Sequence, residues 1–247
     1  DISYNISPAT ITIRALATSF VDKKLRTKRS AAHENKNLTQ IIGYYASLNG
    51  LTPLTKIRKD VIIERETQNN TTDLSFLQGL ANKYGYVFSV RGTQLVFWDI
   101  FDLESSEPIM ELKRTDLKSG SFSDKVSEIY GDCTLAYQNP DTNELVSVTV
   151  ESTIVTRSAD TLELKTKAEN KGQAEEIAKS ELYKRNTEKL TGGFTLQGNT
   201  LLIAGVNINL IEFGNFTGIY HVKESTHSIS NASGYTTGIE IKWIRNA

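Results

Sequence analysis

Apolar side chains recur at helical spacing in three segments of the chain. The first stripe ends at Asn49-Gly50, a typical helix stop, and consists of Leu38, Ile41, Ile42, Tyr45 and Leu48. Residues three and four positions apart share one face of a helix, so this segment predicts an amphipathic helix. Similar stripes cover 74–81 and 174–182. Thr72 or Asp73 is placed to cap the second helix, and Asn170 with Gln173 forms a start resembling a capping box for the third.

Alternation of apolar and polar residues predicts the strands. Residues 145–151 alternate strictly and follow a second run at 128–137 across the turn-rich segment 139–143, which indicates a hairpin. Another hairpin is predicted for 87–98 around Gly92, a single strand for 57–66, and one or two strands within 1–20. Past residue 192 the chain has short runs separated by glycines, as in a barrel or sandwich. The class is mixed α+β, mainly antiparallel β.

The bulk composition is ordinary for a globular protein. The 247 residues include 28 Lys and Arg against 29 Asp and Glu, which gives a net charge of −1 and indicates no nucleic-acid or anionic-membrane partner. A single cysteine excludes an internal disulfide framework. No apolar run is long enough to cross a membrane. The only methionine is Met110, so we interpret the chain as a fragment or a processed form.

The residues that most often carry chemistry do not form a recognisable motif. His33-Glu34 lacks the second histidine of a zinc-protease helix, because Asn37 occupies that position, and a solvated loop is expected. His221 and His227 would lie about 20 Å apart on one strand, so packed or hydrogen-bonded sheet histidines are expected. Cys133 is expected to be a small core residue. We find no phosphate-binding loop and no nucleophile elbow.

The strongest charge feature is a basic stretch at 23–29 with five cations in seven residues. Nucleic acid is one partner that such a stretch can bind, since each neutralised phosphate adds affinity. Aromatic residues are not interleaved with these cations, and the patch does not continue elsewhere in the sequence. A loop that faces solvent or an assembly partner is therefore the preferred interpretation.

Three stretches together resemble the bacteriophage late control D family of tail-hub proteins, which are related to the hub part of the type VI secretion spike. The first is the basic stretch with the 38–51 helix and its Gly-Leu end, and the second runs from Gln68 to Phe97. The third runs from the 174–182 helix to the strand at 239–241 and is the most specific. Its family-motif positions, for which the resemblance implies a structural role, are Gly193, Gly198, Gly205, Gly218, Tyr220, His227, Gly234 and Tyr235.

The resemblance implies barrel domains with an α/β domain between them. We place a remnant of the N-terminal β-barrel at 1–35, the α/β domain at 36–107 with 155–190, and the second β-barrel at 108–154 with 191–247. The implied protein is a structural, non-enzymatic hub without catalytic residues, metal or cofactor. It would form a homotrimer that joins the tail tube to the spike. Its expected partners are the spike, the tube and other baseplate proteins. Its expected location is the virion tail baseplate, assembled in the cytoplasm of the host bacterium.

Two alternatives remain open at this stage. A carbohydrate- or host-receptor-binding module would present aromatic residues on one face, and Tyr44, Tyr45, Phe97 and Trp98 are the candidates. Their positions also suit core packing, which we prefer. A cell-wall hydrolase would need a pair of acidic residues or a metal set, and no spacing of carboxylates in the sequence indicates one.

Overall fold

The computed structural model describes residues 2–6, 9–13, 23–125, 127–138, 144–155 and 160–245. The chain divides into two compact units, the first made of residues 1–81 and 87–97 and the second of 82–86 and 98–247. The elements that build mainly the first unit are β1 (Ile2–Ile6), β2 (Ala9–Ile13), η1 (Lys23–Arg26), β3 (Lys28–Asn37), α1 (Leu38–Leu48), β4 (Thr52–Lys56), β5 (Ile62–Thr72), α2 (Asp73–Tyr84), β6 (Tyr86–Arg91) and β7 (Gln94–Asp99).

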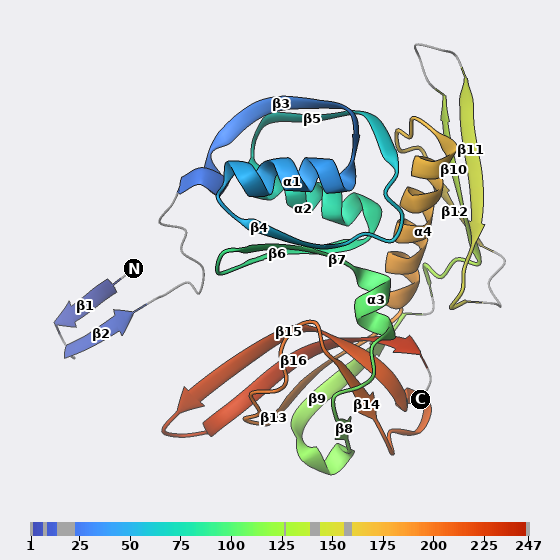
Figure 1. Cartoon of the computed structure of the whole chain (residues 1–247). Coiled ribbons are helices and arrows are strands. Elements are labelled where there is room, and N and C mark those ends of the chain that lie inside the picture. The colour runs from blue at the N-terminus through green and yellow to red at the C-terminus, as the bar shows by residue number, and fades with distance from the viewer. Residues whose placement is uncertain are drawn as a thin grey trace. The chain divides into compact units, whose positions relative to one another are not determined.

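In the first unit, α1 and α2 lie between two layers, the antiparallel ribbon β3–β5 and the sheet β4–β7–β6 (Figure 1). Helix α1 begins at a capping box, because Asn37 and Gln40 each accept a hydrogen bond from the other's backbone N–H. The predicted stripe forms the core, since Leu38, Ile42 and Tyr45 are fully buried. The helices predicted near 38–48 and 74–84 are confirmed.

Two predictions for this unit are wrong. The basic stretch 23–29 is not a plain loop, because it forms η1 and then enters β3 at Lys28. The strand predicted at 57–66 starts only at Ile62, and β4 precedes it. Strand β3 could not be predicted from an alternation of apolar and polar residues, because its sequence is mostly polar and charged and only one of its residues, His33, is buried. Its pairing with β5 fixes it instead.

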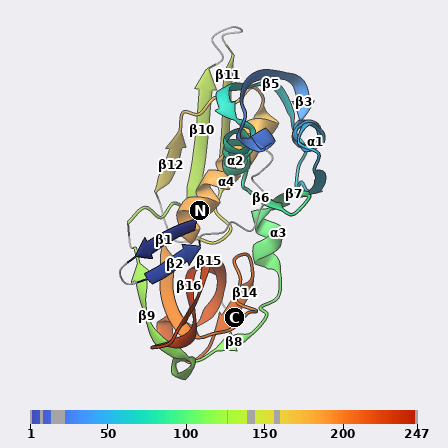
Figure 2. The same cartoon turned by 90° about the vertical axis from the view of Figure 1, so that its left-hand side faces the viewer.

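The second unit contains a three-stranded sheet covered by a helix. Its elements are α3 (Ile100–Ser105), β8 (Glu111–Leu112), η2 (Arg114–Asp116), β9 (Leu117–Asp124), β10 (Asp132–Gln138), β11 (Leu145–Glu151), β12 (Thr161–Leu164), α4 (Lys171–Thr187), β13 (Leu190–Gln197), β14 (Asn207–Leu210), η3 (Gly214–Phe216), β15 (Gly218–Ser230) and β16 (Gly234–Arg245). Strand β10 pairs with β11 antiparallel and with β12 parallel. Helix α4 packs along β10 and β11 (Figure 2).

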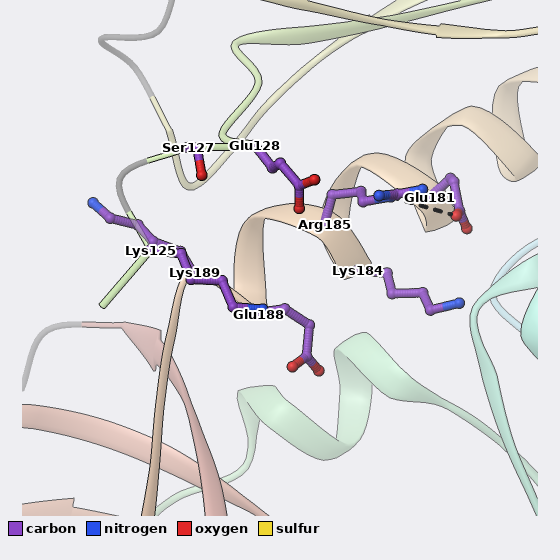
Figure 3. Close-up of a pocket in the computed structure, with 8 residues that line it drawn as sticks. All are labelled: Lys125, Ser127, Glu128, Glu181, Lys184, Arg185, Glu188 and Lys189. Atoms are coloured by element: carbon purple, nitrogen blue, oxygen red, sulfur yellow. Dashed lines mark ion pairs between the residues drawn. The ribbon is translucent and has the colours of Figure 1, made fainter. Parts of the chain in front are cut away.

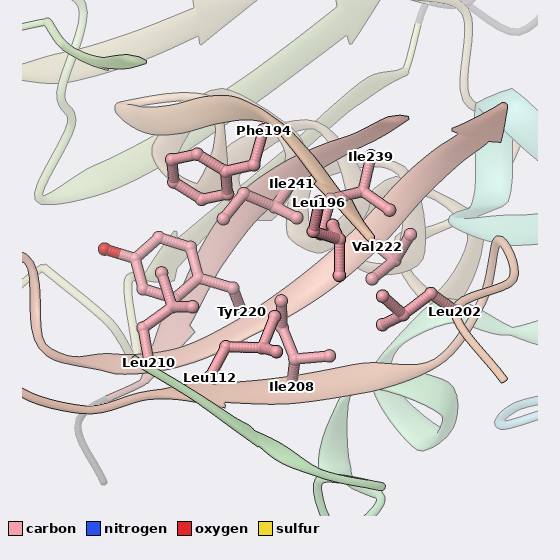
Figure 4. Close-up of a cluster of buried hydrophobic side chains, with 10 residues drawn as sticks. All are labelled: Leu112, Phe194, Leu196, Leu202, Ile208, Leu210, Tyr220, Val222, Ile239 and Ile241. Carbon is pink, nitrogen blue, oxygen red and sulfur yellow. The ribbon is translucent and has the colours of Figure 1, made fainter. Parts of the chain in front are cut away.

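The remaining strands of this unit form a curved six-stranded sheet in the order β8-β14-β15-β16-β13-β9, a half-barrel. Its concave face holds the apolar cluster of Figure 4: Leu112, Phe194, Leu196, Leu202, Ile208, Leu210, Tyr220, Val222, Ile239 and Ile241. Strands β10 and β11, which the sequence analysis placed with the second barrel, pair with β12 rather than with this sheet. The class, mixed α+β with mainly antiparallel sheets, is confirmed.

Candidate assembly surfaces

The three histidines are hydrogen-bonded parts of the sheets. Among the described residues no group of three or more His, Cys, Asp or Glu side chains is placed to hold a metal ion. His33 is not in a solvated loop as predicted: it lies buried in β3, where its Nε2 is 2.9 Å from the Tyr45 hydroxyl. Tyr45 donates to Gln68, which donates to the buried Asp73. This chain of polar groups holds the ribbon against the helices.

His221 is buried in the half-barrel, and its Nδ1 lies 2.8 Å from Oδ1 of Asn207. Burial, and secondarily the cation of Lys242, lowers the pKa of His221 to about 4. The imidazole is therefore neutral at physiological pH. The amide nitrogen of Asn207 donates to the carbonyls of Leu103, Glu104 and Ser106 at the end of α3. The packed, hydrogen-bonded histidine predicted here is confirmed.

A buried charged cluster, the Glu104 cluster, joins three elements of the second unit. Glu104 at the end of α3 forms an ion pair with Lys242 of β16 and accepts a hydrogen bond from the Tyr183 hydroxyl of α4. Burial and the adjacent carboxylate of Glu104 raise the pKa of Tyr183, so the phenol stays protonated. The sequence analysis missed this cluster because its three residues are far apart in the chain.

Cys133 is a core residue of β10, as predicted. It is free and fully buried. Burial, with smaller contributions from Glu181 and Asp132, raises the pKa of its thiol to about 11. A nucleophilic cysteine needs a lowered pKa, so this thiol is not suited to catalysis at neutral pH.

Three of the family-motif residues come together near the turn of the β15–β16 hairpin. The Tyr235 hydroxyl lies 2.9 Å from Nδ1 of His227, and the backbone N–H of Gly198 donates to the Tyr235 carbonyl at 2.9 Å. A Cβ on Gly198 would lie 2.0 Å from a ring atom of Tyr235. Glycine is needed here because the tyrosine ring covers the backbone. The contact fastens the loop after β13 to the hairpin.

The other motif residues occupy separate places. Gly205 has a positive φ of 99° and donates its N–H to Val222. Gly218 opens β15, and Tyr220 is buried with its hydroxyl donating to the Phe216 carbonyl at 2.8 Å. Gly234 opens β16, whereas Gly193 lies within β13 with open space where a Cβ would be.

An aromatic hollow lies between the edge strand β9 and the η3 loop. It has a volume of about 670 Å³, and phenylalanines 122, 194, 213 and 216 are among the residues that line it. Phe122 stacks on Phe216 with ring centroids 4.5 Å apart. Arg114 and Lys118 add cations to the lining. The sequence analysis did not single out these phenylalanines, although Phe213 and Phe216 flank a Gly-Asn turn, where large apolar residues are unusual.

A second hollow of about 260 Å³ lies at the C-terminal end of α4 (Figure 3). Its charges are mixed, and it is lined by Lys125, Ser127, Glu128, Glu181, Lys184, Arg185, Glu188 and Lys189. Arg185 lies 3.9 Å from Glu181, and Lys223 pairs with Glu188 at 2.8 Å. The negative end of the helix dipole opposes anion binding here. We interpret this hollow as a solvated polar surface.

The aromatic face required by a carbohydrate-binding module is not formed by the four candidates. Tyr45 and Phe97 are fully buried, which confirms core packing for these two, while Tyr44 is 48% exposed. Large exposed apolar side chains occur elsewhere: Tyr4, Ile6, Leu54, Ile62, Ile109, Leu145, Leu201, Ile203 and Ile229. In the part of the chain that the structure describes, no helix is both long and apolar enough to span a bilayer.

The fold of the described residues is similar to that of several phage tail proteins. The structure is similar to the tail protein from Neisseria meningitidis MC58 (TM-score 0.66, 14% identity), with 89% of this chain and 71% of that one covered. It is also similar to the 43 kDa tail protein of prophage MuSo2 from Shewanella oneidensis (TM-score 0.65, 15% identity, 87% and 67% covered).

A third similar structure is the E. coli c3393 protein, a type VI secretion component with structural similarity to the T4 bacteriophage tail proteins gp27 and gp5. The TM-score is 0.56 at 14% identity, with 90% of this chain and 54% of that one covered. The sequence itself matches no protein-family model. It also matches no curated protein. The likeness is therefore one of fold, and it agrees with the tail-hub resemblance of the sequence.

Proposed function

We propose that this chain is a structural hub subunit of a phage-type or contractile-injection tail baseplate. It forms a homotrimer that joins the tail tube to the spike, and its partners are the spike, the tube and other baseplate proteins. It acts in the virion tail after assembly in the bacterial cytoplasm. The observation that carries the proposal is the similarity of fold to tail proteins over almost the whole chain, at 89% coverage in one case.

Two features of the molecule support an assembly role. The half-barrel leaves β9 at an open edge, and unpaired sheet edges are ordinarily covered by a neighbour. Several large apolar side chains are exposed, of which Ile229 at 84% and Ile6 at 81% are the most exposed. The fitting role is non-enzymatic, since Cys133 has a raised pKa and the three histidines are hydrogen-bonded within the sheets.

Light scattering on this chain and on a version extended at its N-terminus tests the proposal. We expect a mass of about three times the 27.5 kDa chain in at least one form. A strict monomer in both, at high concentration and moderate salt, would contradict it. A peptidoglycan zymogram checks the hydrolase alternative. A clearing band that disappeared on mutation of one carboxylate would favour the enzyme.

A further inference from the structure

Strand β9 is the edge at which the half-barrel is open. It pairs with β13 along one side, and the six-stranded sheet ends there. Six of its eight residues are exposed. An exposed edge of this length presents a row of backbone N–H and C=O groups that an extended segment can pair with.

The aromatic hollow lies directly beside this edge. Phe122 on β9 and Phe216 on η3 are both half-buried, so their stacked rings form an apolar surface that water still reaches. A Cβ at Gly120 would lie 2.1 Å from the Phe194 ring, so the edge strand passes directly over that ring. A strand added to β9 would thus have a pocket for one large apolar side chain.

The β1–β2 hairpin is a segment of this chain that could pair with the β9 edge and fill the hollow. Strands β1 and β2 form a two-stranded hairpin in which Tyr4 is 66% and Ile6 is 81% exposed. An isolated two-stranded hairpin is marginally stable in water and needs a further surface to pack on. Residues 1–13 contain one carboxylate and no lysine or arginine, so the hairpin brings no cation to a hollow whose charged lining residues are Arg114, Lys118 and Glu212.

We propose that the β1–β2 hairpin of one copy adds to the β9 edge of the next copy and places Tyr4 or Ile6 in its aromatic hollow. This rests on the proposed hub function and names the contact between its subunits. The nine residues 14–22 can span at most about 30 Å when extended, which allows the hairpin to reach a neighbour. The contact joins two different surfaces, and such head-to-tail contacts form a closed ring when the rotation between successive copies closes, as in the proposed trimer.

Cross-linking between separately labelled chains tests the contact. One chain carries Ser3→Cys, next to Tyr4, and the other Ser119→Cys, both exposed positions in a Cys133→Ala background, and a short bis-maleimide is added to the mixture. We expect a covalent heterodimer. Phe216→Asp on the Ser119→Cys chain should abolish it, because a carboxylate in the hollow opposes docking of an apolar side chain. Ile229→Asp, at an exposed apolar residue of the β15–β16 hairpin, introduces the same charge away from the hollow and should leave the yield unchanged.

Phe216→Asp could abolish the cross-link simply by unfolding the half-barrel. Tyr4→Asp is therefore a second test, because it changes the docking side chain and leaves the half-barrel intact. In a chain with Cys at both 119 and 3, Tyr4→Asp and Phe216→Asp should each also prevent trimer formation. A trimer that forms without any cross-link would overturn this contact and leave the proposed function standing. A monomer in both the present and the extended chain would refute both. Cross-links found only within single doubly substituted chains would show that the hairpin closes its own half-barrel.

Discussion

The Glu104 carboxylate lies 2.7 Å from the Lys242 ammonium, and the two side chains are only 2% and 9% exposed. The pair connects the end of α3 to β16, and Tyr183 of α4 donates to the same carboxylate. Arg245 also donates to the Glu104 carbonyl, so the short helix is attached to the half-barrel through side chain and backbone. The relative placement of α3, α4 and the half-barrel therefore depends on charged groups that have left water.

Removing one member of this buried ion pair is expected to lower the free energy of unfolding far more than breaking an exposed ion pair. Lys242→Met leaves Glu104 buried without its cation and should lower the free energy of unfolding by about 3–5 kcal/mol. Lys223→Met, which breaks the exposed pair with Glu188, should cost about 1 kcal/mol or less. Denaturant titration followed by tryptophan fluorescence measures both, because Trp98 and Trp243 belong to the second unit.

The double variant Glu104→Leu with Lys242→Met provides the control for this prediction. It removes both charges and should recover much of the loss, since an apolar pair of similar size avoids the desolvation cost. Equal losses for Lys242→Met and Lys223→Met would show that the buried pair has no special role.

Acidification should destabilise the second unit through His221. Its pKa is about 4 in the folded state and about 6.5 when unfolded, so the unfolded state binds the extra proton first as pH falls. Above pH 6.5 proton binding at His221 leaves the free energy of unfolding unchanged. Between about pH 6.5 and 4 the free energy of unfolding falls, by a total of about 3 kcal/mol. The difference between the pH–stability curves of the wild type and His221→Gln isolates this effect from the carboxylates. Parallel curves would contradict the assignment.

An element can be predicted from the sequence when the interactions that form it join residues close together in the chain. The helices α1, α2 and α4 were found because their stripes and caps lie within a few residues of each other, as with Asn170 and the backbone of Gln173. Helix α3 was missed because its end is held by Asn207 and Arg245 from the far end of the chain. The hollow was missed for the same reason, since Phe122 and Phe216 meet only in the folded half-barrel.

The Gly198 contact predicts a position-specific intolerance of side chains. Gly198→Ala places a methyl group against the Tyr235 ring and should cost about 1–3 kcal/mol through overpacking. Gly193→Ala, where no atom lies within 4 Å of the added Cβ, is the matched control and should be nearly neutral. In a Tyr235→Ser background, Gly198→Ala should lose most of its effect, and a double-mutant cycle by denaturant titration measures that coupling. Additive losses would mean that the ring is not the obstacle.

Cys133 should be unreactive in the folded protein. Its thiol is fully buried, and at pH 8 a pKa of about 11 leaves very little of the reactive thiolate. Maleimide labelling at pH 8 should therefore follow the opening of the second unit: it should be slow in buffer and rapid in denaturant. Ser233→Cys in the exposed turn between β15 and β16 provides a comparison within the same molecule and should label promptly without denaturant. If both thiols react at similar rates in buffer, the sheet formed by β10, β11 and β12 opens far more readily than its burial implies.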